Sequence, residues 1–284
     1  MILNKNKTIK PTVFFINDKK NINNLYRKSL MEHIRKKQFD VRSVGLKRVL
    51  HLWFLHSKSD FIYSSNLRTN LIICLLFFNN VNIILNGLGR YHRNKIFRFI
   101  VGKLLGLGNK RVFIQNYRDY RYFRRNFAIN KTEWVIGSGA SYRRKNGSDG
   151  YFNINRDNKI ELCIDELKDF CNKYKVKIKI VGIEKNLKNL SIQKVGIVDQ
   201  SEILLHGKEF VWLGGYGDGF PHSLADVLFN QITVHISKKE FIRFGLYKLS
   251  KTVIKRSGWY VITPQNFDEL SCENVNDLYT TGLH

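Results

Sequence analysis

Short apolar runs alternate along the chain with longer segments in which apolar residues recur at every third or fourth position. The runs, such as residues 12–16 (TVFFI) and 81–85 (VNIIL), are rich in β-branched and aromatic side chains, which is typical of buried strands. The spaced segments, such as residues 95–105, are typical of helices with one apolar face. Strands that alternate with helices predict a parallel sheet covered on both faces, so we predict an α/β fold.

The same pattern locates the individual elements and the division of the chain. It predicts strands at residues 12–16, 39–44, 60–65, 81–85, 111–115, 134–136, 151–155, 176–181, 210–213, 234–237 and 259–262. It predicts helices at residues 23–36, 49–55, 95–105, 160–174, 201–205, 221–229 and 266–279, and one that carries residues 71–78 and is capped by Asn66. Residues 137–150, rich in Gly, Ser and charge, separate the halves. We therefore expect two Rossmann-like domains, residues 1–136 and 137–284, facing each other across a cleft.

Residues 210–237 contain a strand, a glycine-rich turn, a helix and a second strand in direct succession. The turn includes Gly217 and Gly219, and the helix begins just after it. The first N–H groups of such a helix have no partner within the helix, and its dipole makes that end partly positive, so a diphosphate fits there. Pro221 is tolerated in a first helical turn, and Ser223 can cap the helix locally.

Two carboxylates flank this helix start. Asp218 and Asp226 are eight residues apart, one at the tip of the turn and one about two turns into the helix. Carboxylates that accept from hydroxyls, beside N–H groups that donate to phosphate, suit a nucleotide sugar. An ordinary glycine turn followed by an amphipathic helix with two solvated aspartates explains the same residues, and the pattern leaves both interpretations open.

The net charge of the chain indicates which kind of partner it binds. The 284 residues include 48 Lys and Arg against 23 Asp and Glu, a net charge of +25. Such an excess predicts anionic partners: phosphorylated small molecules, acidic lipid surfaces or nucleic acid. Part of the excess is compositional, because Lys, Asn and Ile are abundant throughout. A hydrophobic content of 43% excludes a disordered chain.

The cysteines and the lengths of the apolar segments predict the cellular compartment of the protein. The four cysteines, Cys74, Cys163, Cys171 and Cys272, have no CxxC spacing, so we expect reduced cysteines and no zinc site. The first ten residues lack the apolar stretch of a signal peptide. The longest apolar run, residues 71–78, is far shorter than the roughly 20 residues that span a bilayer. We expect a cytoplasmic protein whose membrane contact is peripheral.

Four motifs occur in an order that resembles a known family. They are NGLGRY (residues 86–91), VFIQN (112–116), IGSG (136–139) and DGFPHSLADVL (218–228). Together they resemble glycosyltransferase family 4, the retaining GT-B enzymes of bacterial surface-polysaccharide assembly, over about residues 12–262. The resemblance implies transfer of a sugar from a nucleotide-diphosphate donor to a lipid-linked or growing glycan. Its biological setting would be O-antigen (lipopolysaccharide), capsule or exopolysaccharide biosynthesis at the inner face of the plasma membrane.

The resemblance also implies roles for the two carboxylates and their neighbours. Asp218 corresponds to the acidic residue that contacts the transferred sugar, and Asp226 to the one that binds the ribose. His222 lies inside the motif, so we take Asp218 and His222 as the catalytic candidates; a histidine at a helix start is equally often incidental. Both acidic residues are Asp where the family has Glu.

The remaining donor-binding residues are assigned by the same resemblance. The loop whose backbone holds the diphosphate corresponds to Gly217, Gly219, Phe220 and Pro221, with Ser223 at the helix start. The cations that neutralise the phosphates lie, in the family, just after the first strand of the second domain, where this chain has Arg156 and Lys159. Since these cations and the helix dipole stabilise the departing diphosphate, we expect no metal and no other cofactor.

Basic segments of the first half suggest the acceptor side. Gly87, Gly89 and Arg90 form a loop that we expect to contact the acceptor or lie at the domain interface, although basic loops are often simply solvated. Residues 117–127 (YRDYRYFRRNF) interleave aromatic residues with arginines, as in surfaces that bind nucleic acid or membrane. A lipid-linked acceptor favours an anionic membrane surface.

A second function class stays open beside the enzyme. The chain can instead be a catalytically inactive or non-enzymatic basic α/β module that binds an anionic polymer, either nucleic acid or polysaccharide. The charge is spread over both halves and no nucleic-acid-binding motif occurs, so we do not expect nucleic acid as a partner.

Overall fold

The computed structural model describes residues 11–55, 60–77, 79–141, 143, 149–185, 187, 192–199, 202–213, 219–256, 258–281 and 283. The chain divides into two compact units. Unit 1 comprises Met1–Gln115, Asp119–Ser138 and Asn276–His284, and unit 2 comprises Asn116–Arg118 and Gly139–Val275. Each unit contains its own sheet, so the protein is an α/β protein with two Rossmann-like sheets. The division differs from our expected domains mainly in the segment from Asn276 onward, which belongs to unit 1.

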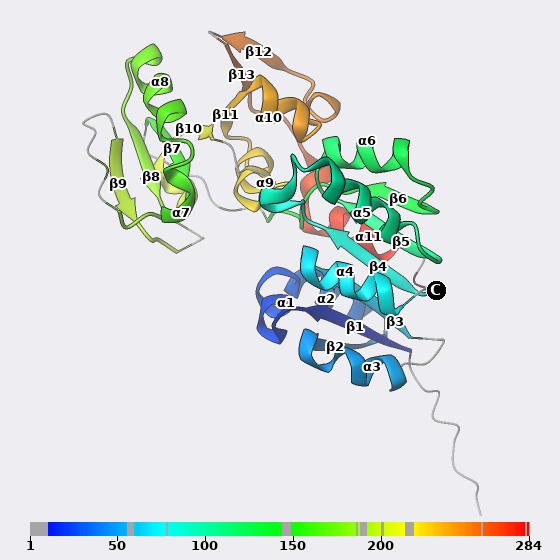
Figure 1. The fold of residues 1–284 in the computed structure, drawn as a ribbon. Helices are drawn as coiled ribbons and strands as arrows, with labels where there is room; N and C mark the ends of the chain where they lie inside the picture. Colours follow the sequence, from blue (N-terminus) through cyan, green and yellow to red (C-terminus); the bar gives the residue numbers. More distant parts are fainter. Residues whose placement is uncertain are drawn as a thin grey trace, which may run out of the picture. The chain divides into compact units, whose positions relative to one another are not determined.

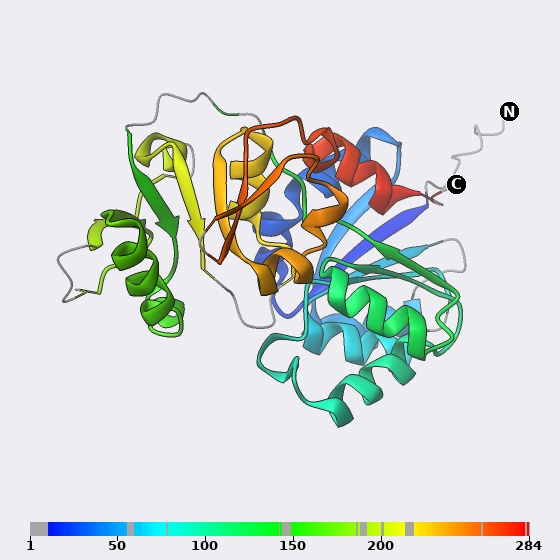
Figure 2. The same ribbon diagram turned by 90° about the horizontal axis from the view of Figure 1, so that it is seen from above.

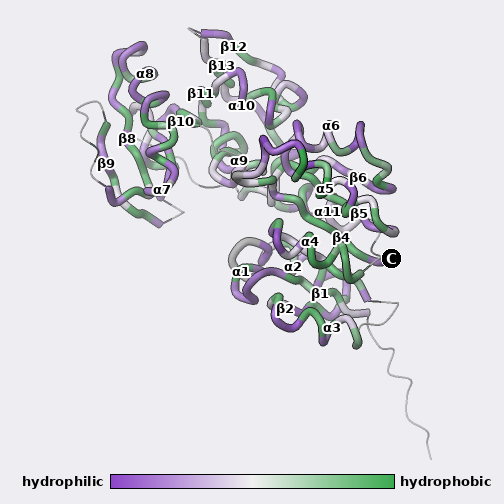
Figure 3. The backbone as a smooth tube through the Cα atoms, viewed as in Figure 1, coloured by the Kyte–Doolittle hydropathy of each residue, from purple (hydrophilic) through white to green (hydrophobic). Residues whose placement is uncertain are grey.

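The sheet of unit 1 has the strand order β2-β1-β3-β4-β5-β6, with every neighbouring pair parallel. Its strands are β1 (Thr12–Asn17), β2 (Asp40–Gly45), β3 (Phe61–Ser65), β4 (Val81–Leu85), β5 (Lys110–Ile114) and β6 (Lys131–Trp134). Every residue of β4 is buried, and its hydrophobic colouring contrasts with the polar helix α6 in Figure 3. Such strands need cover on both faces.

Two layers of helices provide that cover (Figures 1 and 2). One layer consists of α3 (Val49–Leu55), α4 (Leu67–Leu76), α5 (Lys95–Leu105) and α6 (Tyr117–Asn126). It shares a hydrophobic core with the strand residues Ile83 and Leu85. The other layer consists of α1 (Lys20–Tyr26), α2 (Lys28–Lys36) and the end of α11 (Cys272–Thr280). Short 3₁₀ helices, η1 (Leu46–Arg48) and η2 (Gly89–Tyr91), complete the unit.

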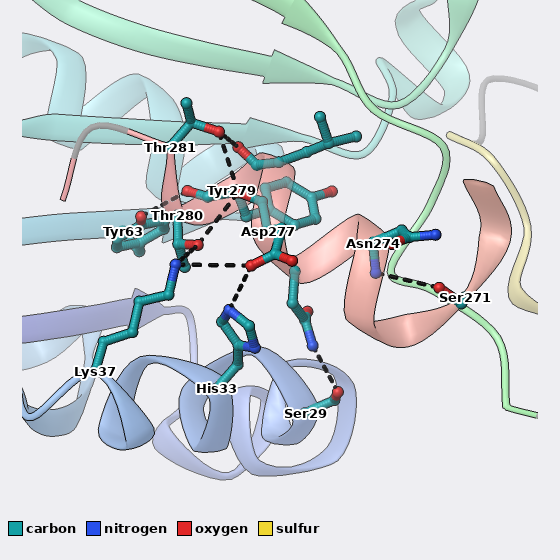
Figure 4. Close-up of polar contacts among 12 residues, drawn as sticks. Ser29, His33, Lys37, Tyr63, Ser271, Asn274, Asp277, Tyr279, Thr280 and Thr281 are labelled. Carbon is teal, nitrogen blue, oxygen red and sulfur yellow. Dashed lines mark hydrogen bonds and ion pairs between the residues drawn. The ribbon is translucent and has the colours of Figure 1, made fainter. Parts of the chain in front are cut away.

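The last residues of α11 are fixed to unit 1 by both rings and polar groups. The ring of Tyr279 meets Phe113 edge-on at 5.1 Å, and Tyr63 donates to the Tyr279 carbonyl at 2.7 Å. Asp277 lies 3.0 Å from His33 and 3.7 Å from Lys37, both on α2 (Figure 4). These contacts link positions more than 160 residues apart, which explains why sequence periodicity alone did not assign this segment to the first sheet.

Unit 2 has a seven-stranded sheet in the order β12-β13-β11-β10-β7-β8-β9. The parallel strands are β7 (Tyr151–Ile154), β8 (Ile178–Val181), β9 (Ile192–Gly196), β10 (Glu209–Trp212) and β11 (Thr233–Ser237). The antiparallel strands β13 (Trp259–Ile262) and β12 (Val253–Arg256) extend the sheet beyond β11. The helices are α7 (Asp157–Ile160), α8 (Ile164–Tyr174), α9 (His222–Phe229) and α10 (Lys238–Arg243), with η3 (Ile203–His206), η4 (Leu246–Lys248) and η5 (Asp268–Leu270).

Several predicted elements need correction. Strands β9 and β12 and helix α10 were missed; the two strands are largely exposed and lack the apolar run that marks a buried strand. The helix expected at residues 23–36 is two helices that meet at Arg27, and the strand expected at 134–136 ends at Trp134. The terminal helix begins at Cys272 rather than 266. Asn66 does not cap α4 through its side chain, which donates to Asp18 instead.

Glycine at position 102 allows α5 to approach the segment that follows α6. A Cβ added there would lie 2.3 Å from the Phe127 ring. We therefore predict that Gly102→Ala lowers the free energy of unfolding by about 1–3 kcal/mol, since overpacking outweighs the helix propensity gained. Urea unfolding measures this. Gly45→Ala is the control, because its nearest new contact is 3.5 Å away; equal stability of the two variants would contradict the prediction.

Candidate functional site

The strand order of unit 2 reverses between two neighbouring parallel strands. From β7 the chain continues to β8 and β9 on one side, and it then returns to build β10 and β11 on the other. Ligands in open α/β sheets bind beyond the carboxyl ends of the strands at such a reversal. The segments that follow β7 and β10 therefore form the candidate site. They contain most of the donor-binding and catalytic residues that the sequence predicts.

The segment after β10 leads into α9. Gly217 and Asp218 lie outside the described residues, which resume at Gly219. Pro221 occupies the position before the helix, and its carbonyl accepts the N–H of Ala225 at 3.0 Å. Pro221 is the N-cap residue and makes no side-chain cap. Ser223 is the second residue of the helix, so the capping role expected for it is wrong. The first-turn N–H groups of the helix lie at this edge of the sheet.

The side chains at the start of α9 differ in their surroundings. Phe220 is buried and its ring contacts Phe244 at 5.5 Å between centroids. Its side chain therefore anchors the turn, which leaves the backbone as the part that can meet a ligand. His222, the first residue of α9, is exposed.

The segment after β7 carries the two candidate cations. Arg156 is exposed and Lys159 half-buried, and the Arg156 N–H donates to Asn155 at 2.9 Å. The next residue, Asp157, accepts the N–H groups of Lys185 and Glu184, and these hydrogen bonds lower its pKa, with Lys185 contributing most. These hydrogen bonds tie the segment after β7 to the segment after β8. Arg156 and Lys159 follow β7, the strand that pairs with β10.

Asp226 is held inside unit 2 by the segment that precedes β7. The carboxylate lies 3.5 Å from the guanidinium of Arg143, and the Asp226 side chain is 10% exposed. Asn230, fully buried one turn later, donates to the carbonyls of Asp226 at 2.8 Å and Ser141 at 3.2 Å. It also accepts the N–H of Arg143 at 2.8 Å. One helix therefore positions both the candidate ribose carboxylate and the segment at residues 139–143.

Arg143 and Asn230 were not among the site residues predicted from the sequence. Arg143 lies in a stretch whose composition indicated only a linker, and Asn230 follows the last apolar turn of α9. A polar residue at a helix end is usually solvated, so no local signal marked its burial. Their partners are up to 89 residues away in the chain, and only the fold brings them together.

The candidate acceptor loop follows β4 in unit 1. Gly87 and Gly89 have φ angles of 145° and 55°, which favour glycine. The Asn86 side chain accepts from the buried guanidinium of Arg27 at 2.5 Å. The side chain of Arg90 is outside the described part of the structure. The loop therefore has the conformation that its glycines allow, and Arg27 fixes its first residue.

The remaining chemical groups do not add a reactive centre to the part of the chain that is described. No group of three or more His, Cys, Asp or Glu side chains within that part could hold a metal ion. The described cysteines are free; Cys74, Cys163 and Cys171 are buried and Cys272 is half-buried. Burial raises the pKa of Cys163 to about 11. None of the described helices is both long and apolar enough to cross a bilayer.

Comparisons with known proteins find a likeness in structure but none in sequence. No protein-family model and no curated protein matches the chain. Among solved structures, HepE of Anabaena, in complex with UDP and glucose, is similar over 70% of this chain and 73% of its own, with 11% identity and a TM-score of 0.46. A likeness at this level carries no information about substrate or activity, which have to be inferred from the chain's own residues.

We predict that Asn230→Ala lowers the free energy of unfolding by about 1–3 kcal/mol per buried group left unpaired. The substitution removes the hydrogen bonds to Arg143, Ser141 and Asp226. Thermal and urea unfolding measure the change. The control is Asn126→Ala on the exposed surface of α6, where a single local bond to Tyr122 is lost. A loss at Asn230 no greater than at Asn126 would show that the buried bonds contribute little.

Proposed function

We propose that the chain is a glycosyltransferase that moves a sugar from a nucleoside-diphosphate donor to a lipid-linked or growing glycan, with retention of the anomeric configuration. The observation that carries the proposal is the topology of unit 2, in which a helix start and a segment with two cations follow neighbouring strands at the strand-order reversal. The helix start follows β10 and the cations Arg156 and Lys159 follow β7, and the two strands are parallel neighbours.

Each part of this edge suits one part of a nucleotide sugar. The N–H groups at the start of α9 and the backbone of Gly219 donate to the diphosphate. Arg156 and Lys159 neutralise its charge, which stabilises the leaving group as it departs. In the proposal, Asp226 accepts hydrogen bonds from the ribose hydroxyls. Gly217 completes the diphosphate loop, while Asp218 and His222 contact the sugar.

The retaining mechanism is the one that the family resemblance implies, and this assignment of charge is compatible with it. Bond cleavage between the sugar and the diphosphate develops positive charge on the anomeric carbon and negative charge on the phosphate oxygen. Stabilising the negative charge accelerates the reaction without an enzymic nucleophile or a metal. The acceptor hydroxyl then attacks from the face that the diphosphate leaves, and its proton passes to the departing phosphate oxygen. Gly87, Gly89 and Arg90 of unit 1 are the proposed acceptor loop.

A membrane surface is the second part of the proposal. Between residues 46 and 130 the sequence has 15 Lys and Arg and only two acidic residues. Helix α5 exposes Ile96 by 74%, Phe99 by 53% and Ile100 by 49%. The Lys103 ammonium lies 5.5 Å from the centre of the Phe99 ring on the same helix. An apolar strip flanked by cations suits an anionic lipid surface, where a lipid-linked acceptor and surface-glycan assembly would be found.

A binding module without chemistry is the competing function. Such a module would use the basic surface of unit 1 to hold nucleic acid or an anionic polysaccharide. It would have no use for a helix start and cations at the strand-order reversal of unit 2. Isothermal titration separates the two: saturable binding of UDP, GDP or ADP supports the enzyme, whereas salt-sensitive binding of oligonucleotides alone supports the module.

We predict that the double variant Arg156→Ala, Lys159→Ala binds its nucleoside diphosphate about tenfold or more weakly, because charge-assisted hydrogen bonds to phosphate are lost. Isothermal titration with UDP, GDP and ADP identifies the nucleotide and measures the change. The nucleoside should be affected much less than the diphosphate, since it carries no charge.

The matched control removes the same charge from the opposite edge of the sheet. Lys173 and Lys177 are exposed and lie before β8 rather than after β7. The variant Lys173→Ala, Lys177→Ala should retain wild-type affinity. Equal losses in the two double variants would mean that only the overall positive charge matters, and an unchanged affinity at Arg156 and Lys159 would remove them from the site.

We predict that the protein binds phosphatidylglycerol vesicles at low salt, and that Phe99→Ser with Ile100→Ser weakens this binding several-fold. Each basic residue near an anionic leaflet contributes on the order of 1 kcal/mol, and salt screens the attraction. Vesicle sedimentation at low and high salt measures it. Leu162→Ser with Ile197→Ser, which changes exposed apolar residues of unit 2, is the control. No preference over phosphatidylcholine vesicles would contradict the membrane surface.

A further inference from the structure

The salt bridge between Arg143 and Asp226 joins the candidate ribose carboxylate to the segment where unit 2 begins. Unit 2 resumes at Gly139, four residues before Arg143. The Arg143 side chain is 19% exposed and the Asp226 side chain 10%, so both groups are largely removed from water. A charged pair in such surroundings holds its geometry more firmly than a solvated pair, because either charge left alone would be costly.

The backbone at residues 139 and 140, shortly before Arg143, is held by a second segment of unit 2. Ala140 forms a parallel bridge with Ser271, donating to the Leu270 carbonyl at 2.7 Å and accepting from Cys272 at 3.0 Å. A Cβ at Gly139 would lie 2.5 Å from the Cys272 Cα, so the backbones touch there. Arg143 therefore reaches Asp226 from a backbone that neighbouring residues hold in place.

The main chain of Arg143 is fixed separately from its side chain. Its N–H donates to the Asn230 side chain at 2.8 Å, so two contacts with α9, one turn apart, set the direction of the guanidinium. If Arg143 served only to pack this segment against the helix, its backbone hydrogen bond to Asn230 would be sufficient. The additional charge contact acts on one atom group, the carboxylate of Asp226.

We propose that Arg143 is a positioning residue that orients the Asp226 carboxylate for the ribose hydroxyls of the donor. The inference rests on the proposed function, because it requires a nucleotide at this helix. One carboxylate oxygen, Oδ2, is held by Arg143. In this proposal, the ribose hydroxyls donate to the same carboxylate. Without Arg143, the carboxylate rotates toward water and loses its selectivity for the hydroxyl pair.

The test compares a nucleoside diphosphate with its 2′,3′-dideoxy analogue by isothermal titration. In the wild-type protein, the ribose form, whichever of UDP, GDP and ADP binds, should bind about tenfold more tightly than the analogue, as expected for hydrogen bonds to a charged group. In Arg143→Ala this ratio should fall toward one. Arg143→Lys, which restores the charge, should recover most of the ratio, and Arg143→Gln serves if the alanine variant is poorly folded.

Two further variants separate positioning from general loss of structure or charge. Asp226→Asn should reduce the ratio as much as Arg143→Ala, and the double variant should reduce it no further. Arg156→Ala should weaken both ligands equally and leave the ratio unchanged, since Arg156 is assigned to phosphate.

The outcomes distinguish the failure of this inference from the failure of the proposed function. A wild-type protein that binds no nucleoside diphosphate overturns both. A protein that binds the nucleotides but keeps its ratio in Arg143→Ala and Arg143→Gln retains the proposed function and loses the role of Arg143. If the wild-type protein binds both ligands equally, Asp226 does not bind the ribose, and Arg143 has no role in positioning it.

Discussion

The pairing of β7 with β10 is the contact on which the candidate site depends. Its backbone ladder joins two residue pairs, Tyr151 with Glu209 and Phe152 with Phe210. Beyond them the side chain of Asn153, fully buried, donates to the Val211 carbonyl at 2.7 Å. A side-chain amide thus continues the ladder where the backbone register ends. Since the pairing is parallel, the segments that follow both strands emerge at one edge of the sheet, and the residues that we propose to bind phosphate, about 60 positions apart, lie in those segments.

A comparable role in unit 1 belongs to Arg27. Its guanidinium is buried and donates to Asn86 and Ser138, each at 2.5 Å. Burial lowers its pKa, while Tyr279 acts in the opposite direction. Neutral acceptors compensate a buried charge less well than a carboxylate does. The arrangement connects three segments, because the Arg27 side chain joins the break between α1 and α2 to the loops after β4 and β6.

Donor and acceptor functions place different demands on these two units. In the proposed function, a diphosphate leaving group needs donors and cations that are already oriented, and unit 2 offers the start of α9 and the cations that follow β7. The proposed acceptor, attached to lipid, would need a surface compatible with the bilayer, and α5 of unit 1 exposes apolar residues next to basic residues in its sequence. Basic residues occur in both halves of the chain, but between residues 46 and 130 few acidic residues offset them.

The apolar pattern by itself determined the α/β class and most buried strands, because a strand covered on both faces must be a continuous apolar run such as residues 81–85. It also located the helix start after Gly219, since glycines and a proline impose local backbone geometry. It could not find β9 and β12, whose residues are mainly exposed, or assign α11 to the first sheet. Only tertiary structure decided that Arg143 meets Asp226 and that Asn230 is buried, because those contacts depend on packing between segments over 80 residues apart, which no local pattern records.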